Sequence, residues 1–72
     1  RNVRCNAIAP GFIETEMTRK LPPEVRSDYL SRIPAGRLGE PKEIADAVSF
    51  LIGPSAKYIT GTVLPVDGGL TT

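Results

Sequence analysis

Residues 3–11 decide the fold, and they read Val3-Arg4-Cys5-Asn6-Ala7-Ile8-Ala9-Pro10-Gly11. Small or apolar side chains stand at every second position from Val3 to Ala9, which is the period of a β-strand. Pro10 ends this strand because proline has no N–H for the ladder, and Gly11 opens a tight turn. A second strand is predicted over about residues 62–66, where Pro65 indicates an edge position or a bulge.

The segment between the two strands has helical patterns. A short turn is expected to begin near Thr15, a second helix begins at Pro23 and ends at Pro34, and one more turn follows over residues 55–57. The clearest helix runs from Pro41 to Ile52, and its predicted apolar face comprises Ile44, Ala45, Val48, Leu51 and Ile52. Strands joined through helices favour parallel pairing, and a parallel sheet needs more strands and cover on both faces. We therefore expect the end of a larger α/β sheet.

Composition excludes several classes of function. The 72 residues include one cysteine, Cys5, and no histidine, so neither an internal disulfide nor a histidine-bearing zinc site is available. Nine basic and eight acidic residues leave a net charge of +1, which argues against nucleic acid or an anionic membrane as partner. No apolar run approaches the roughly 20 residues of a membrane span, and the arginine start does not resemble a signal peptide. The cysteine count suits a reducing compartment, and we expect the cytoplasm.

A few polar side chains invite a chemical role without the partners that it requires. Glu14 and Glu16 alternate on a loop with no third ligand or histidine, so we interpret them as solvated surface and expect no metal site. Cys5 is expected on the buried face of the first strand, as a small hydrophobe rather than a reactive thiol. Only three residues follow Asp67-Gly68-Gly69, which favours a terminal cap over a hairpin turn.

Four ordered blocks carry a family resemblance over the whole chain: residues 6–17, 33–41, 58–61 and 66–69, spelled Asn6-Ala7-Ile8-Ala9-Pro10-Gly11-Phe12-Ile13-Glu14-Thr15-Glu16-Met17, Ile33-Pro34-Ala35-Gly36-Arg37-Leu38-Gly39-Glu40-Pro41, Tyr58-Ile59-Thr60-Gly61 and Val66-Asp67-Gly68-Gly69. They resemble the C-terminal part of short-chain dehydrogenases/reductases, and most of all the 3-oxoacyl-[acyl-carrier-protein] reductases of fatty acid synthesis. The resemblance implies a doubly wound, Rossmann-type parallel sheet that binds NAD(P) at the carboxyl ends of its strands. Residues 1–72 would be a C-terminal fragment of that single domain, with its sixth and seventh strands.

The same resemblance implies that the catalytic groups lie outside this chain. The family's glycine-rich loop and catalytic serine have no counterpart here, and neither Tyr58 nor Tyr29 is followed four positions later by lysine. We therefore expect no catalytic residue in these residues and no activity of the chain by itself. The complete protein would be an NADPH-dependent oxidoreductase; NAD stays open, because the residues that read the ribose 2′ position lie near the family's second strand.

What the resemblance leaves in the chain is the nicotinamide side of the site. It implies that Pro10 and Gly11 let the backbone approach the ring, and that Ile13 holds the carboxamide through main-chain groups. Thr15 would hydrogen-bond the carboxamide or the pyrophosphate, at a helix N-terminus whose N–H groups and dipole favour an anion. From the residues alone, Pro10-Gly11 is only a turn and Thr15 only an N-cap.

The resemblance also implies a flap and a carrier-protein contact. Residues 16–33 would form a mobile flap over the substrate, where the residues alone leave an ordinary helical hairpin open. Arg1 holds the position at which acyl-carrier reductases place a basic residue for the acidic carrier protein, and Arg4 and Arg19 would extend this patch. Solvated surface charge is the alternative for all three arginines.

The implied substrate is an acyl-carrier-protein thioester or a small ketone. The implied assembly is a homotetramer formed through the helix Pro41–Ile52 and the last strand, which would bury Ile44, Val48, Leu51 and Val66 against a second copy. Two other functions stay open: another short-chain dehydrogenase acting on an alcohol, steroid or sugar, and a non-catalytic packing or oligomerisation module.

Overall fold

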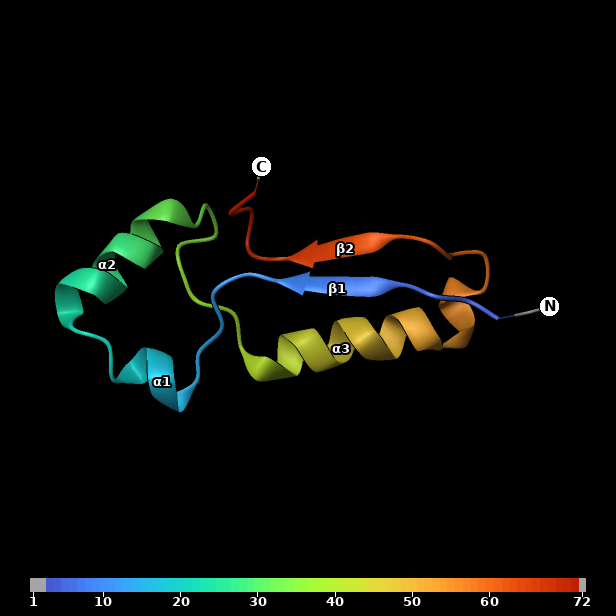
Figure 1. The fold of residues 1–72 in the computed structure, drawn as a ribbon, viewed down its shortest axis with the longest axis horizontal. Helices are drawn as coiled ribbons and strands as arrows, with labels where there is room; N and C mark the ends of the chain where they lie inside the picture. Colours follow the sequence, from blue (N-terminus) through green and yellow to red (C-terminus); the bar gives the residue numbers. More distant parts are fainter. Residues whose placement is uncertain (1–2, 72) are drawn as a thin grey trace.

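The structure, a computed structural model, describes residues 3–71, in which a parallel pair of strands is joined through helices. The elements in chain order are β1 (Ala7–Pro10), α1 (Glu16–Arg19), α2 (Pro23–Arg32), α3 (Pro41–Ile52), a 3-10 turn (Pro54–Ala56) and β2 (Val63–Val66). Figure 1 shows both strands pointing toward α1 and α2, while α3 runs alongside the sheet. The predicted α/β class with parallel pairing is confirmed.

β1 begins later than predicted because side-chain bonds interrupt the backbone pairing before it, where the Gly61 N–H donates to the Cys5 carbonyl at 2.8 Å. The Asn6 amide donates to the Ile59 carbonyl at 3.1 Å and accepts from the Thr62 N–H at 3.0 Å, whereas the ladder proper starts with the Ala7 N–H on the Thr62 carbonyl. At the far end the Gly11 N–H donates to the Val66 carbonyl at 3.1 Å. In this phase of a parallel ladder the Pro65 nitrogen faces away from β1, so the proline costs this strand pair no hydrogen bond, and the edge position stays a prediction.

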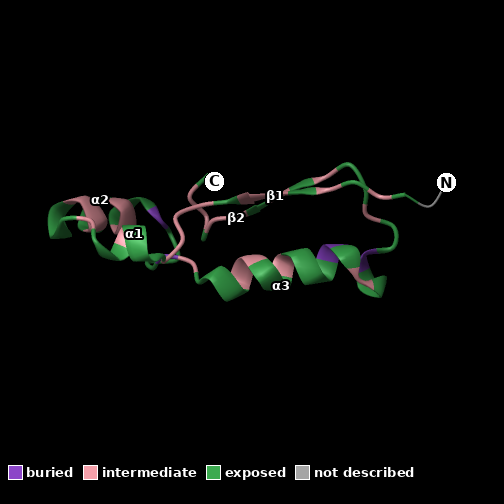
Figure 2. Ribbon diagram, turned by 60° about the horizontal axis from the view of Figure 1, so that its bottom comes forward, coloured by how far each residue is buried: buried purple, intermediate pink, exposed green. Residues whose placement is uncertain are grey.

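α3 covers one face of the strand pair, and the described part of the chain leaves the other face open (Figure 2). Leu51 is buried and Ile44 is half-buried, as predicted for the apolar face of the helix. Val48 and Ile52 are exposed, but both line one cleft together with Leu51 and Ile8, which agrees with the predicted face. Ala45 is exposed, one residue and about 100° beyond Ile44 around the helix, so its place on that face was wrong.

The face of β1 that α3 covers is opposite to the predicted one. Cys5 is exposed, whereas Arg4 and Ile8 are half-buried and turned toward α3. The period of two was right and its phase was wrong, because a shift of one residue exchanges the two faces of a strand. Cys5 is therefore not a buried hydrophobe in the described part of the chain.

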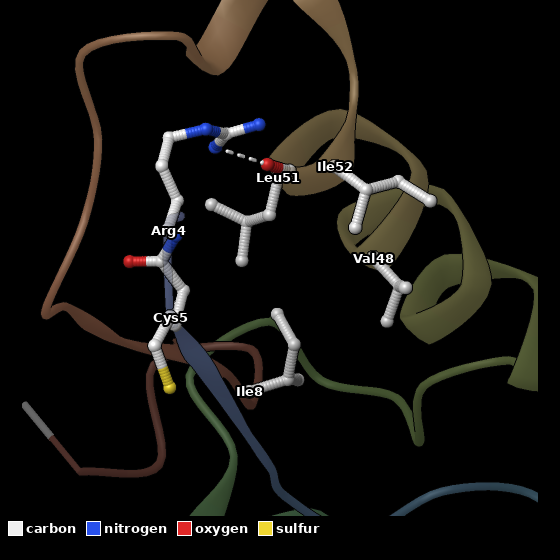
Figure 3. A pocket seen from close by; sticks show the side chains of 7 residues that line it. Arg4, Cys5, Ile8, Val48, Leu51 and Ile52 are labelled. Atoms are coloured by element: carbon white, nitrogen blue, oxygen red, sulfur yellow. Dashed lines mark hydrogen bonds between the residues drawn. The ribbon is translucent and has the colours of Figure 1, made fainter. Parts of the chain in front are cut away.

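Arg4 caps the C-terminus of α3 and thereby determines which side of the first strand faces the helix. Its Nη1 donates to the carbonyls of Leu51 at 2.7 Å, Ala56 at 2.8 Å and Ile59 at 3.3 Å, and Figure 3 shows the first of these bonds beside a cleft of about 390 Å³. The last turn of α3 has no basic residue of its own, so Arg4 supplies the cation that the helix C-terminus favours. The prediction that Arg4 extends a carrier-docking patch was wrong, since its guanidinium is turned onto these carbonyls.

α1 and α2 form a separate lobe beyond the carboxyl ends of the strands (Figure 1). Two stretches connect this lobe to the sheet, residues 11–15 and 33–40. They are joined by a bridge in which the Glu14 N–H donates to the Gly39 carbonyl at 2.7 Å and the Gly39 N–H donates to the Phe12 carbonyl at 3.0 Å. Ile33 and Leu38 are buried at this junction. No helix within residues 3–71 is long and apolar enough to cross a membrane.

Candidate cofactor and substrate site

The turn after β1 passes directly over the end of β2. Pro10 lies opposite Val66, and a Cβ placed on Gly11 would lie 2.6 Å from the Cβ of Asp67, closer than real side chains approach. The two strand ends can come together only because residue 11 has no side chain. The backbone of residues 10–13 therefore lies at the carboxyl end of the sheet, where parallel α/β folds bind their ligands.

Ile13 directs its main-chain N–H and carbonyl to one side of this loop. Its bridge to Gly39 uses the neighbouring Phe12 carbonyl and Glu14 N–H, so the N–H and carbonyl of Ile13 itself face the other way. The Ile13 carbonyl accepts a hydrogen bond from Thr18 Oγ1 at 3.2 Å, and the Ile13 N–H has no partner among residues 3–71. One free donor beside an acceptor with a remaining lone pair complements a primary carboxamide.

Thr15 is the N-cap of α1, as predicted. Its backbone is extended, with φ −140° and ψ 174°, its hydroxyl accepts from the Thr18 N–H at 3.3 Å, and Thr18 Oγ1 accepts from the Thr15 N–H at 2.7 Å. α1 has only four residues, so its dipole is far smaller than that of a long helix. The group that Thr15 can offer a ligand is thus its hydroxyl, and its contact with the cofactor stays a prediction.

Glu14 is not solvated surface. Its carboxylate receives two bonds from Arg26 on α2, Nη1 to Oε1 at 3.0 Å and Nη2 to Oε2 at 2.5 Å, and only 20% of its side chain is exposed. These bonds, more than the nearby charge, hold the pKa of Glu14 below its ordinary value. The two residues lie twelve positions apart on different elements, so no helix or strand spacing connects them.

Glu16 is exposed, as predicted. Within residues 3–71 the structure brings together no group of three or more histidine, cysteine, aspartate or glutamate side chains that could hold a metal ion.

The aromatic rings of Phe12 and Tyr29 stack with centroids 4.2 Å apart and an interplanar angle of 12°. This stack is a second contact between the loop and α2, beside the Glu14–Arg26 pair.

Asp67 directly follows β2 and lies beside Gly11 of the loop. Its carboxylate accepts from the Thr71 hydroxyl at 2.7 Å and from the Gly69 N–H at 3.0 Å, and these bonds lower its pKa. Residues 68–71 form turns and no returning strand, which agrees with the terminal cap expected for Asp67-Gly68-Gly69.

Of the predicted carrier-binding arginines, Arg1 lies outside the described residues and Arg19 is largely exposed, with 66% of its side chain accessible.

Comparison with known proteins places this loop and sheet in a family. A family model described as enoyl-(acyl carrier protein) reductase, of the short-chain dehydrogenase/reductase type, matches residues 1–71. The chain belongs to the short-chain dehydrogenases/reductases. The predicted resemblance is therefore confirmed at the level of the family.

Individual members of the family are similar over nearly the whole chain. The 3-oxoacyl-[acyl-carrier-protein] reductase FabG of Thermotoga maritima is 56% identical and that of Vibrio cholerae 57% identical, each over 97% of this chain. Galactitol 2-dehydrogenase (L-tagatose-forming) of Cereibacter sphaeroides is 53% identical over 99% of the chain. The chain spans only 28–29% of the length of these dehydrogenases and reductases.

A solved structure confirms the fold class. The crystal structure of 3-oxoacyl-[acyl-carrier protein] reductase from Brucella melitensis matches 99% of this chain, with a TM-score of 0.95 and 38% sequence identity. The match covers 26% of that crystal chain. The strand pair, α3 and the α1–α2 lobe thus correspond to a part of a Rossmann-type short-chain dehydrogenase fold.

Proposed function

We propose that residues 1–72 are the C-terminal part of one NAD(P)-binding Rossmann domain, in an NADPH-dependent 3-oxoacyl-[acyl-carrier-protein] reductase. The observation that carries this proposal is the 56–57% identity to two 3-oxoacyl-[acyl-carrier-protein] reductases over 97% of the chain. The part assigned to these residues is the nicotinamide-side loop, the substrate flap and an oligomer interface. No catalytic residue is assigned within the chain.

The main-chain groups of Ile13 fit the cofactor's carboxamide. The free Ile13 N–H would donate to the carboxamide oxygen, and the Ile13 carbonyl would accept from the carboxamide NH₂ while keeping its bond from Thr18. The Thr15 hydroxyl accepts from the Thr18 N–H, which leaves its own hydrogen for the carboxamide or the pyrophosphate. Gly11 has no side chain, so the backbone of the Pro10–Gly11 turn would be able to approach the ring. When bound, NADPH supplies the hydride that reduces a 3-keto thioester.

The proposed partners use two other surfaces. Arg1 and Arg19 would meet the acidic carrier protein. The proposed homotetramer would form through α3 and β2, where Phe50, Ile52 and Val63 are 46%, 75% and 63% exposed. Leu51 cannot join that interface as predicted, because it is already buried against β1 within the chain. With one cysteine and no internal disulfide, the protein suits the reducing cytoplasm, which we propose as its compartment.

A substrate comparison on the full-length protein that carries these residues tests the proposal. We expect faster oxidation of NADPH than of NADH with acetoacetyl-acyl carrier protein, and slower turnover with a small keto ester that lacks the carrier. Arg1→Glu should reduce turnover of the carrier-bound substrate and spare the keto ester, because only the former presents an acidic protein surface. Equal loss on both substrates would remove the carrier contact.

A polyol dehydrogenase is the second candidate, because galactitol 2-dehydrogenase is 53% identical over 99% of the chain. The same protein incubated with galactitol and NAD⁺ separates the two. Turnover of galactitol without reduction of the acyl thioester would replace the proposed substrate while keeping the dehydrogenase chemistry. No turnover of either, together with no NADPH binding, would overturn the proposed function as a whole.

A further inference from the structure

The Glu14 carboxylate joins the loop to both helices of the flap. It accepts the two-point bond from Arg26 on α2, and Thr18 Oγ1 of α1 lies 3.4 Å from its Oε1. Arg26 also donates from Nη1 to the Thr18 carbonyl at 3.2 Å, so its guanidinium ties α2 to α1 as well. The loop, α1 and α2 therefore meet at this one ion pair.

Arg26, rather than Arg19, holds the carboxylate. The Arg26 side chain is 31% exposed and makes two parallel bonds, whereas Arg19 is 66% exposed and its Nε lies 3.9 Å from Oε1. A two-point guanidinium–carboxylate pair fixes orientation as well as distance, because both groups are planar. The pair therefore constrains the angle at which α2 leaves the loop.

Glu14 is also fixed through its backbone. Its N–H donates to the Gly39 carbonyl at 2.7 Å. The single hydrogen of Thr18 Oγ1 is shared among the Thr15 carbonyl at 2.9 Å, the carbonyl of the preceding residue, Ile13, at 3.2 Å and Glu14 Oε1 at 3.4 Å. Movement of α2 that pulled on the Glu14 side chain would act on the residue next to Ile13, and movement of α1 would act on the Ile13 carbonyl through Thr18. The ion pair thus couples the flap to the main-chain groups that face the proposed carboxamide.

We propose that Glu14 and Arg26 are positioning residues: their ion pair clasps the α1–α2 flap to the loop and holds the Ile13 main chain in its binding orientation. This inference rests on the proposed function for the identity of the ligand. The clasp itself rests only on contacts within the chain. Opening of the flap breaks the pair, and closing it restores the orientation of Ile13.

The test uses four variants of the full-length protein and one matched control. Glu14→Gln and Arg26→Gln each remove one charge, the double variant removes both, and Arg26→Lys keeps the charge without the planar two-point bond. The control is Arg32→Gln, which removes a charge from the same helix, since Arg32 pairs with Asp28 at 2.8 Å and is 59% exposed. Thermal unfolding identifies any variant that fails to fold, and Arg26→Lys keeps the test available in that case.

Hydrogen exchange of the amides in residues 16–32 measures the clasp without any ligand. We expect Arg26→Gln to speed exchange of the α2 amides about three- to tenfold and Arg32→Gln to leave it unchanged. The Glu14→Gln/Arg26→Gln double variant should match the single variants, because both break the same pair. Unchanged exchange in Arg26→Gln, or strict additivity in the double variant, overturns the clasp.

Direct NADPH titration, followed by fluorescence, measures the positioning role. We expect the dissociation constant to rise about three- to tenfold in Glu14→Gln and Arg26→Gln, to recover in part in Arg26→Lys, and to stay unchanged in Arg32→Gln. Faster exchange with an unchanged dissociation constant overturns the positioning role. If the unaltered protein fails to bind NADPH, the proposed function fails, while the exchange experiment still decides whether the clasp exists.

Discussion

Replacing Arg4 should destabilise the protein far more than an ordinary surface substitution. Arg4→Met keeps the length of the aliphatic stem and removes the cation that caps α3. The Nη1 amino group has two hydrogens, so two of its three bonds, at 2.7 and 2.8 Å, are strong and the third is shared. Charge-assisted bonds contribute about 1.5–3 kcal/mol each and are not additive within one group. We expect a loss of about 2–4 kcal/mol in the free energy of unfolding.

Chemical denaturation of the full-length protein, followed by circular dichroism, measures this loss. Arg32→Met is the matched control, because Arg32 is largely exposed, and a substitution at such a site changes stability by only about 0.5 kcal/mol. Arg4→Lys should recover part of the loss, since it keeps the charge near the C-terminus of α3. A loss below about 0.5 kcal/mol in Arg4→Met would refute the capping role. Weaker reduction of carrier-bound substrate at unchanged stability would instead restore the docking role.

Four further outcomes are expected. Thr15→Ala should cost about 1 kcal/mol as a lost N-cap and should also raise the Michaelis constant for NADPH; a lowered melting temperature with unchanged cofactor kinetics would make Thr15 a cap only. Gly11→Ala should lower stability by about 1–3 kcal/mol in denaturant titrations, because its Cβ would meet Asp67 at 2.6 Å; wild-type stability would mean that the two strand ends can separate freely. The bonds from Arg37 and from the Glu40 N–H lower the pKa of Glu43 to about 2, below its unfolded value. The contribution of Glu43 to stability is therefore present above about pH 4.3 and is lost as the pH falls toward 2. The difference in unfolding free energy between the wild type and Glu43→Gln should shrink over that range, and a constant difference would contradict this prediction. The isolated 72-residue chain should be weakly folded or self-associated and inactive, because Val63, Phe50 and Ile52 are exposed; cooperative melting of a monomer, seen by circular dichroism and sedimentation, would contradict this.

Local signals predicted the helices well. Pro41 at the first position and Gly53-Pro54 after the last gave the bounds of α3, and Pro23 gave the start of α2. These residues act on the backbone of their own turn, so the sequence near each helix end contains the necessary information. The N-cap role of Thr15 was predictable for the same reason.

Contacts between distant residues were not predictable in this way. The start of β1 and its covered face depend on Arg4 and Asn6, whose partners lie 47 to 56 positions later. The Glu14–Arg26 pair connects a loop to a helix, so neither residue has a neighbour at helical or strand spacing that reveals it. The position of Ile13 in the candidate site came from the family resemblance, because main-chain groups leave no trace in the side-chain pattern.

The bridge between Ile13 and Gly39 makes the flap replaceable. Two adjacent backbone hydrogen bonds, at 2.7 and 3.0 Å, join the point where the chain leaves the sheet to the point where it returns. Residues 14–38 therefore form a long connection whose two ends lie side by side. The entropic cost of closing such a connection grows slowly, by about 0.6 kcal/mol for each doubling of its length. Insertions or deletions between α1 and α2 therefore leave the strand register and the turn at Gly11 unchanged. One sheet can therefore carry flaps of many lengths, and the flap can diversify while the strand pair keeps its geometry.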